Sequence, residues 1–158
     1  MNISVAPERV AQVLGAIALA LLLGALGFQY LANMPPCELC HWQRWPLVAA
    51  AVIGIVGGTI AHDRSAVIFA LMAIVLVAVS GGIGAYQAGV EWHWWSGPAA
   101  CTGTNFVYHG TLDLNAPVVR CDVAAWRLFG ISLAGYNAII SLGSAVIGFL
   151  FLLRGRRP

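Results

Sequence analysis

Residues 65–90 read SAVIFALMAIVLVAVSGGIGAYQAGV, a run that contains no Asp, Glu, Lys or Arg. A helix needs about 20 consecutive apolar residues to cross the hydrocarbon core of a bilayer, so this run predicts a membrane-spanning helix. Three further runs without charged residues, 10–37, 45–62 and 128–153, are apolar and long enough, or nearly so. The sequence therefore predicts four membrane spans.

The composition of the whole chain agrees with a membrane protein. Hydrophobic residues make up 60% of the 158 residues and charged residues only 9%, whereas soluble domains carry about 25% charged residues. The net charge of +2 comes from arginines that form no stripe, so nothing indicates a nucleic-acid partner. We expect an all-α membrane protein, a four-transmembrane-helix bundle in one domain over 1–158. Its spans are expected approximately at 10–33, 41–61, 66–90 and 126–153.

The connections between the spans are expected to be unequal. The run 92–112 is also free of charged residues, but it contains Gly, Pro, Ser, Thr and two histidines. Its backbone would lack partners in lipid, so we interpret it as part of a long second loop over 91–125, after a short first loop. The first span has an apolar core from Val10 to about Ala32, longer than the roughly 7–15 residues of a signal peptide, and is expected to remain as an anchor.

The arginines indicate how the chain is oriented. Four spans place both termini and the turn between spans two and three on one side, and the two cysteine-bearing loops on the other. The positive-inside rule assigns the side with more arginine to the cytoplasm, so both termini are expected there. The terminal side carries Arg9, Arg64, Arg154, Arg156 and Arg157, and the opposite side carries Arg44, Arg120 and Arg127.

All four cysteines fall on the predicted extracytoplasmic side, where disulfides form and persist. Cys37 and Cys40 follow the first span, and Cys101 and Cys121 lie in the second loop. Four cysteines permit three connectivities, and two structural bridges are one interpretation. A bridge across a two-residue gap restrains little of the unfolded chain, however. Because Pro35-Pro36 ends the first span, Cys37 opens the next helix, where unsatisfied N–H groups favour a reactive thiolate.

Two metal-based interpretations compete with a redox role. Cys37-Glu38-Leu39-Cys40-His41 has the pattern of a c-type haem attachment site, with His93 or His109 as the distal ligand. That interpretation leaves the other two cysteines without a role and places a haem at the bilayer edge. A zinc site of two cysteines and two histidines lacks the usual short ligand spacing. We expect no metal site.

Arg44 lies one helical turn beyond Cys40, deeper in the second span. One interpretation is an arginine that reaches up to the lipid headgroups. The other is a cation that stabilises the Cys40 thiolate and the negative charge that develops on the carbonyl oxygen of an electron acceptor.

These motifs resemble the bacterial disulfide bond formation protein B (DsbB) family, and the similarity covers essentially the whole chain. It is strongest in PCELCHWQR at 36–44 and in CD at 121–122 through WRLFGIS at 126–132. YQAGVE at 86–91, leading to Pro98 and Cys101, fits as well. The resemblance implies a bacterial inner-membrane protein that reoxidises a periplasmic DsbA-type thioredoxin-fold protein and passes the electrons to ubiquinone or menaquinone.

The resemblance also implies a role for each site residue. Cys101 would take the mixed disulfide with the partner, and Cys121 would then attack Cys37. Cys40 would be the thiolate that meets the quinone, with Arg44 near the quinone oxygen.

One position departs from the family pattern. Late in span three the family often has a histidine, whereas this chain has Gln87. An amide can hydrogen-bond a quinone oxygen, but it carries no charge near neutral pH.

Redox energetics favour a quinone as the acceptor. A DsbA-type dithiol has a potential near −120 mV, so reducing a glutathione pool at about −200 mV would be uphill by roughly 4 kcal/mol. A lipid-soluble acceptor of higher potential is therefore expected. A vitamin K epoxide reductase-like quinone enzyme remains an alternative, although its Cys-x-x-Cys pair is expected in a late span. A non-enzymatic membrane protein with structural disulfides is the other.

Overall fold

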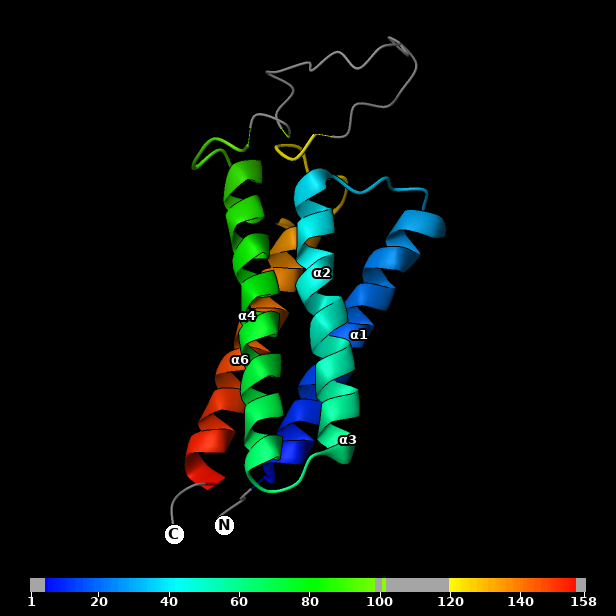
Figure 1. Cartoon of the computed structure of the whole chain (residues 1–158). Helices are drawn as coiled ribbons and strands as arrows, with labels where there is room; N and C mark the ends of the chain where they lie inside the picture. Colours follow the sequence, from blue (N-terminus) through cyan, green and yellow to red (C-terminus); the bar gives the residue numbers. More distant parts are fainter. Residues whose placement is uncertain (1–4, 99–100, 102–119, 156–158) are drawn as a thin grey trace.

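The computed structural model describes residues 5–98, 101 and 120–155. Within these residues, four helices are long and apolar enough to cross a membrane, which confirms the predicted all-α four-helix membrane bundle. The described ends of the chain lie at one end of the bundle. The start of the second span, at Glu38, and the segment from residue 120 to 132 lie at the other end, called the cysteine end (Figure 1). The elements are α1 (Pro7–Tyr30), α2 (Glu38–Val52), η1 (Ile53–Gly57), α3 (Gly58–Ile60), α4 (Arg64–Glu91), β1 (Arg127–Leu128), β2 (Ile131–Ser132) and α6 (Leu133–Gly155).

Helix α2 starts at the cysteine pair. Cys37 has an extended backbone and caps the helix, and its Sγ accepts a hydrogen bond from the backbone N–H of Cys40 at 3.3 Å. This bond satisfies one of the free N–H groups of the first turn. At its other end, α2 continues without interruption through the π-helical turn η1 into α3. The three segments together form the second span.

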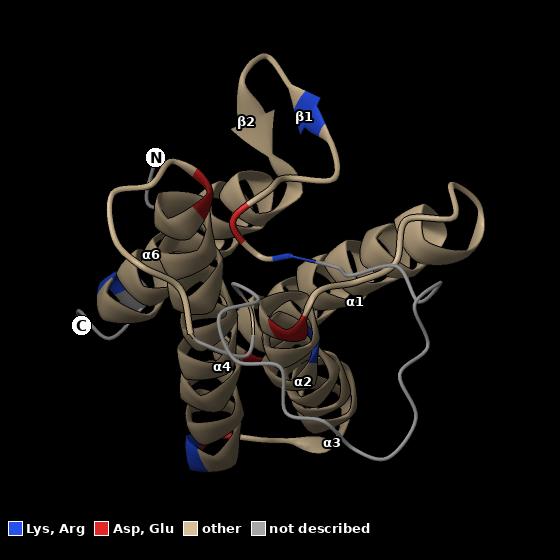
Figure 2. Cartoon of the chain, turned by 90° about the horizontal axis from the view of Figure 1, so that it is seen from above, with Lys and Arg blue, Asp and Glu red and all other residues tan. Residues whose placement is uncertain are grey.

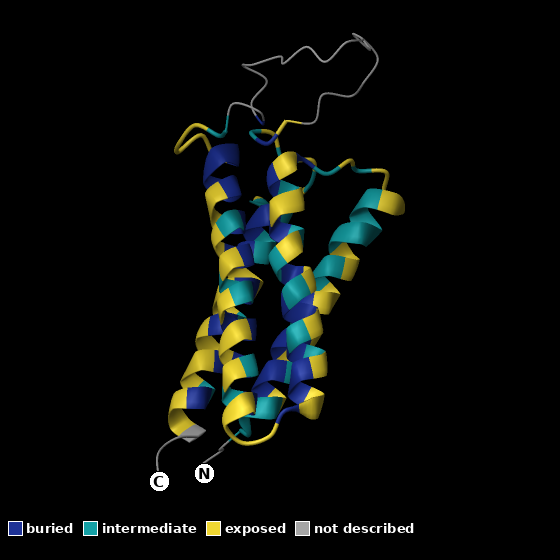
Figure 3. Cartoon of the chain, viewed as in Figure 1, coloured by how far each residue is buried: buried dark blue, intermediate teal, exposed yellow. Residues whose placement is uncertain are grey.

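Small residues let the helices approach closely. A Cβ added to Gly15 of α1 would meet the backbone of Ile55 at 2.8 Å, and one added to Gly54 would meet Ala11 O at 2.5 Å. Such contacts between small residues drive the association of helices in lipid, where the hydrophobic effect is absent. Buried positions face the interior, while exposed apolar positions cover the outside (Figure 3).

The fourth helix begins later than predicted. The expected span starts at residue 126, whereas α6 starts at Leu133, after the antiparallel pair β1–β2. Phe129 and Gly130 both have positive φ, 51° and 81°, as a tight hairpin turn requires. The turn prevents the helix from forming earlier. The first helix is also shifted, since it covers Pro7–Tyr30 where the span is predicted at 10–33.

At the cysteine end, α1 leans away from α2 (Figure 1). A view from above shows that the segment leading into β1 lies beside this end of the helices (Figure 2). Few charged residues interrupt the helices (Figure 2).

Candidate functional site

The structure brings all four cysteines into one cluster, called the cysteine cluster. Cys37, Cys101 and Cys121 are buried together, and Cys40 packs against them. Cys101 and Cys121 form a disulfide with a Cα–Cα distance of 5.2 Å, whereas Cys37 and Cys40 are free thiols. The backbone N–H of Cys121 also donates to the carbonyl of Cys101 at 2.9 Å. A disulfide and a dithiol thus lie side by side.

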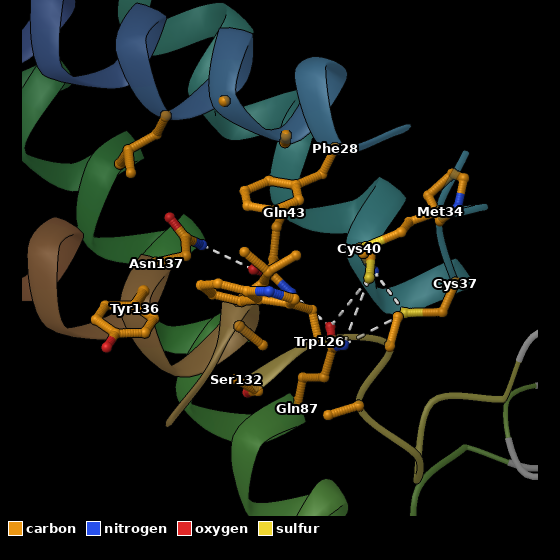
Figure 4. Close-up of a pocket in the computed structure, with 18 of the residues that line it drawn as sticks. Phe28, Met34, Cys37, Cys40, Gln43, Gln87, Trp126, Ser132, Tyr136 and Asn137 are labelled. Atoms are coloured by element: carbon orange, nitrogen blue, oxygen red, sulfur yellow. Dashed lines mark hydrogen bonds between the residues drawn. The ribbon is translucent and has the colours of Figure 1, made fainter. Parts of the chain in front are cut away.

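Gln87 lies directly against the free thiols. Its Nε2 is 3.4 Å from the Sγ atoms of both Cys37 and Cys40 (Figure 4). The same nitrogen donates to Glu91 Oε1 at 3.2 Å, one turn further along α4. The pKa of the Cys37 thiol is raised, first because of its hydrogen bond with Cys40 and then because burial disfavours the thiolate.

Arg44 has a buried donor without a partner. One terminal nitrogen of its guanidinium donates to Gln29 Oε1, and the other donates to the carbonyl of Ala25 at 3.4 Å. Its Nε is buried and has no hydrogen-bond partner among the described residues. An unsatisfied buried donor costs about 1–3 kcal/mol, so this atom is suited to receive an acceptor oxygen from a ligand.

A cavity of about 790 Å³ adjoins the cysteine cluster and Arg44. This volume lies within the range of about 300–1,000 Å³ typical of small-molecule sites. Apolar side chains of α1, α2 and α6 line most of it, and Phe28, Trp126 and Tyr136 form an aromatic row along it (Figure 4). The polar lining includes Cys37, Cys40, Gln43, Arg44, Gln87, Glu91, Arg120 and Asn137. The cavity suits an apolar ligand with a polar head near the thiols.

An exposed ion pair flanks the disulfide. Arg120 Nε donates to Asp122 Oδ1 at 2.9 Å, on either side of Cys121. The hydrogen bond from Arg120 lowers the pKa of the Asp122 carboxyl, with a smaller opposing effect of desolvation. The pair joins the side chains on both sides of a cysteine that the sequence singled out.

The described residues offer no cluster of ligands that would support the metal-binding interpretations. In the described ranges, no three His, Cys, Asp or Glu side chains are grouped to hold a metal ion. His41 is exposed at the start of α2. His109, proposed as a distal haem ligand, lies outside the described residues, as do Arg156, Arg157 and much of the predicted loop 91–125.

Sequence reasoning missed three residues of the site. Gln43, Glu91 and Asn137 line the same cavity as the predicted residues, and both Gln43 and Glu91 are buried. The available signal was their polarity at positions within or at the end of apolar spans, where polar groups are costly.

Comparisons with known proteins identify the family of the chain. The family model described as "Disulfide bond formation protein DsbB" matches residues 7–151. Disulfide bond formation protein B of Acidovorax sp. (strain JS42) is 28% identical over 98% of this chain and 92% of its own length. The protein of that name from Paracidovorax citrulli is 26% identical over 97% of this chain and 91% of its own length. No solved structure matches the chain.

Proposed function

The chain belongs to the disulfide bond formation protein DsbB family, and on that basis we propose that it oxidises a periplasmic DsbA-type thioredoxin-fold protein and passes the electrons to a membrane quinone. Family membership makes it a membrane thiol–disulfide oxidoreductase. The observation that carries the finer proposal is the cysteine cluster beside a largely apolar cavity with Arg44 in its lining.

The first step is exchange between the partner and the Cys101–Cys121 disulfide. A partner thiolate attacks Cys101 Sγ, which forms a mixed disulfide and releases Cys121 as a thiolate. Cys121 Sγ then attacks Cys37 Sγ of an oxidised Cys37–Cys40 pair, and Cys40 leaves as a thiolate. The position of these sulfurs in one cluster supports exchange among them, because exchange requires contact between sulfur atoms.

Two further exchanges complete the electron balance. The second partner thiolate attacks the mixed disulfide, so that the partner leaves oxidised and Cys101 is freed. Cys101 then attacks Cys121 Sγ and re-forms their disulfide while Cys37 is released. The two electrons now reside on the Cys37–Cys40 dithiol, and the state with an intact Cys101–Cys121 disulfide is the one that the structure contains.

The residues that line the cavity fit a quinone, either ubiquinone or menaquinone. The unpartnered Arg44 Nε is a buried donor for a carbonyl oxygen, Cys40 lines the same cavity, and the apolar walls suit an isoprenoid tail. When bound, the quinone supplies an acceptor for two electrons and two protons. Arg44 would bind and orient its head, and Gln87 would hold the sulfurs in place through its amide.

The same proposal includes the placement of the chain. In a bacterial inner membrane with cytoplasmic termini, the cysteine end faces the periplasm. Cys101 then lies on the same side of the membrane as the periplasmic partner, and the bilayer that holds the quinone surrounds the helices that line the cavity. The excess of arginine at the terminal side supports this orientation.

Quinone reduction by the purified protein tests the proposal. With a reduced DsbA-type protein as donor, we expect turnover by the wild type and none by a serine variant of any of the four cysteines. A Cys40→Ser variant should still exchange disulfides with the partner, since Cys101 and Cys121 remain. Quinone reduction that persists without Cys101 and Cys121 would contradict the proposed electron path.

A further inference from the structure

A line of hydrogen-bonded amides crosses the bundle from α6 to the cysteine cluster. Asn137 Nδ2 donates to Gln43 Oε1 at 2.7 Å, and Gln43 Nε2 donates to Gln87 Oε1 at 2.6 Å. Gln87 Nε2 then lies 3.4 Å from the Sγ atoms of Cys37 and Cys40. Each amide donates in the same direction, so the line ends with Gln87 Nε2 against the two sulfurs and the Glu91 carboxyl (Figure 4).

Groups that can only accept fix the direction of this line. The backbone carbonyl of Ser80 lies 3.3 Å from Asn137 Nδ2, which requires the nitrogen of that amide to face α4. Gln43 Nε2 is held in the same way by a carbonyl one turn earlier in α2, at 3.3 Å. The Glu91 carboxyl accepts from Gln87 Nε2 at 3.2 Å. None of the three side-chain amides can flip, exchanging its oxygen and nitrogen, without bringing two oxygen atoms into contact.

The direction matters because a Gln87 amide turned the other way would place its oxygen, not its nitrogen, nearest to both sulfurs. Its Oε1 is 3.7 Å from Cys40 Sγ, close enough to accept from a protonated thiol. An N–H donor stabilises the thiolate, whereas an oxygen acceptor stabilises the thiol. The charged groups that line the same cavity are Glu91 on α4, Arg44 on α2 and Arg120 before β1. The orientation of the neutral Gln87 amide therefore adds to the electrostatic field that these charged groups produce at the sulfurs.

We propose that Asn137 is a positioning residue that acts through Gln43 to hold the amide nitrogen of Gln87, which is also anchored by Glu91, against the Cys37–Cys40 pair. The inference rests on the proposed function for its purpose: thiolate is the form of the dithiol that gives up electrons. Asn137 stands on a different helix from both cysteines. The line thus couples the packing of α6 against α2 and α4 to the reactivity of the thiols.

A purely structural role would be the simpler explanation of these polar groups. Side-chain hydrogen bonds hold helices together in lipid, and the bond that Asn137 Nδ2 on α6 donates to Ser80 Oγ on α4 at 3.1 Å fits that role. Such a role requires only that each group has a partner. It does not require that successive amides share one direction or that the last donor lies on two sulfurs.

The test is the pH dependence of thiol alkylation. The reduced protein in detergent is treated with iodoacetamide, and modification of the Cys37–Cys40 pair is followed by mass spectrometry over a series of pH values. In Asn137→Leu, we expect the pH midpoint of alkylation to rise by roughly one unit, or about tenfold less thiolate below the midpoint. Gln43→Met, which removes the middle amide, should raise the midpoint similarly.

The double variant and a matched control separate the two roles. Because both substitutions interrupt one line, the double variant should show little more shift than either single variant. Ser144→Ala removes a hydroxyl of α6 that bonds only within its own helix, to the Ser141 carbonyl at 3.0 Å, and should keep the wild-type midpoint. If Asn137→Leu fails to fold, the pH midpoint of alkylation of Gln43→Met tests the proposal by itself.

A wild-type midpoint in a folded Asn137→Leu or Gln43→Met variant would overturn the proposal, as would a double variant whose shift is the sum of the single shifts. Alkylation uses neither quinone nor partner, so it is independent of the proposed function. An active wild type with an unshifted Asn137→Leu refutes the positioning role alone. A shifted variant in a protein that reduces no quinone refutes the proposed function alone.

Discussion

Replacing Arg44 is the change whose effect the structure defines best. Its guanidinium is anchored by Gln29 and by the Ala25 carbonyl, the residue lines the cavity, and its buried Nε has no partner among the described residues. A hydrogen bond to a charged group contributes about 1.5–3 kcal/mol. If the developing negative charge of the quinone head receives this bond, Arg44→Met should lower kcat/KM for quinone by roughly 10- to 150-fold.

Lysine at the same position separates charge from geometry. Arg44→Lys keeps the positive charge but loses the planar set of donors, and its shorter reach abandons the contacts with Gln29 and Ala25. We expect it to keep part of the activity, with a raised apparent KM for quinone as the main defect. A Gln29→Leu variant, which frees the guanidinium without removing it, should show a smaller loss than Arg44→Met.

The assay is quinone reduction at several quinone concentrations, paired with single-turnover disulfide exchange without quinone. Exchange with the partner should survive in both Arg44 variants, because it occurs at Cys101 and Cys121. Arg154→Met is the matched control, since this arginine lies in the last turn of α6, at the opposite end of the bundle. A methionine variant at position 44 with wild-type quinone kinetics would refute the reasoning and leave Arg44 as a membrane-edge anchor.

Three further predictions concern the rest of the path. Cys121→Ala should accumulate a partner adduct on Cys101, visible on a non-reducing gel; an adduct seen only when Cys101 is replaced would reverse their roles. Gly24→Val should lower kcat/KM for quinone several-fold, because Gly24 lines the cavity. Gly27→Val is the control on the same helix: a side chain has open space there as well, but Gly27 is not in the lining, so kcat/KM should stay unchanged. Equal losses in the two variants would refute the cavity as the quinone site. After reduction, a membrane-impermeant thiol reagent should label the four cysteines of the cysteine cluster from the periplasm. Labelling from the cytoplasm alone would reverse the orientation.

The fold was predictable from sequence because lipid imposes a simple rule. Charge-free runs such as 65–90 must form helices, since no other open structure satisfies the backbone in a bilayer. The start of α6 was not predictable in the same way. Arg127-Leu128-Phe129-Gly130 is apolar enough to extend a span, and only the left-handed backbone of Phe129 and Gly130 reveals the hairpin.

Part of the site was likewise predictable from sequence and part was not. Cys37 and Cys40 could be placed at a helix start from Pro35-Pro36 alone, because proline acts locally. The amide line through Gln43 and Asn137 could not, since it depends on the rotation of α2 and α6 about their axes. A polar residue in an apolar span signals that a partner exists, but the sequence does not identify that partner.

The central claim is that two electrons pass from a periplasmic dithiol through this chain to a quinone. The most direct measurement is the ratio of partner disulfides formed to quinol produced, under anaerobic conditions, with catalytic amounts of the purified protein. We expect one quinol for each partner disulfide, over many turnovers. A partner that stays reduced, with all four cysteines unchanged and no quinol formed, would contradict it.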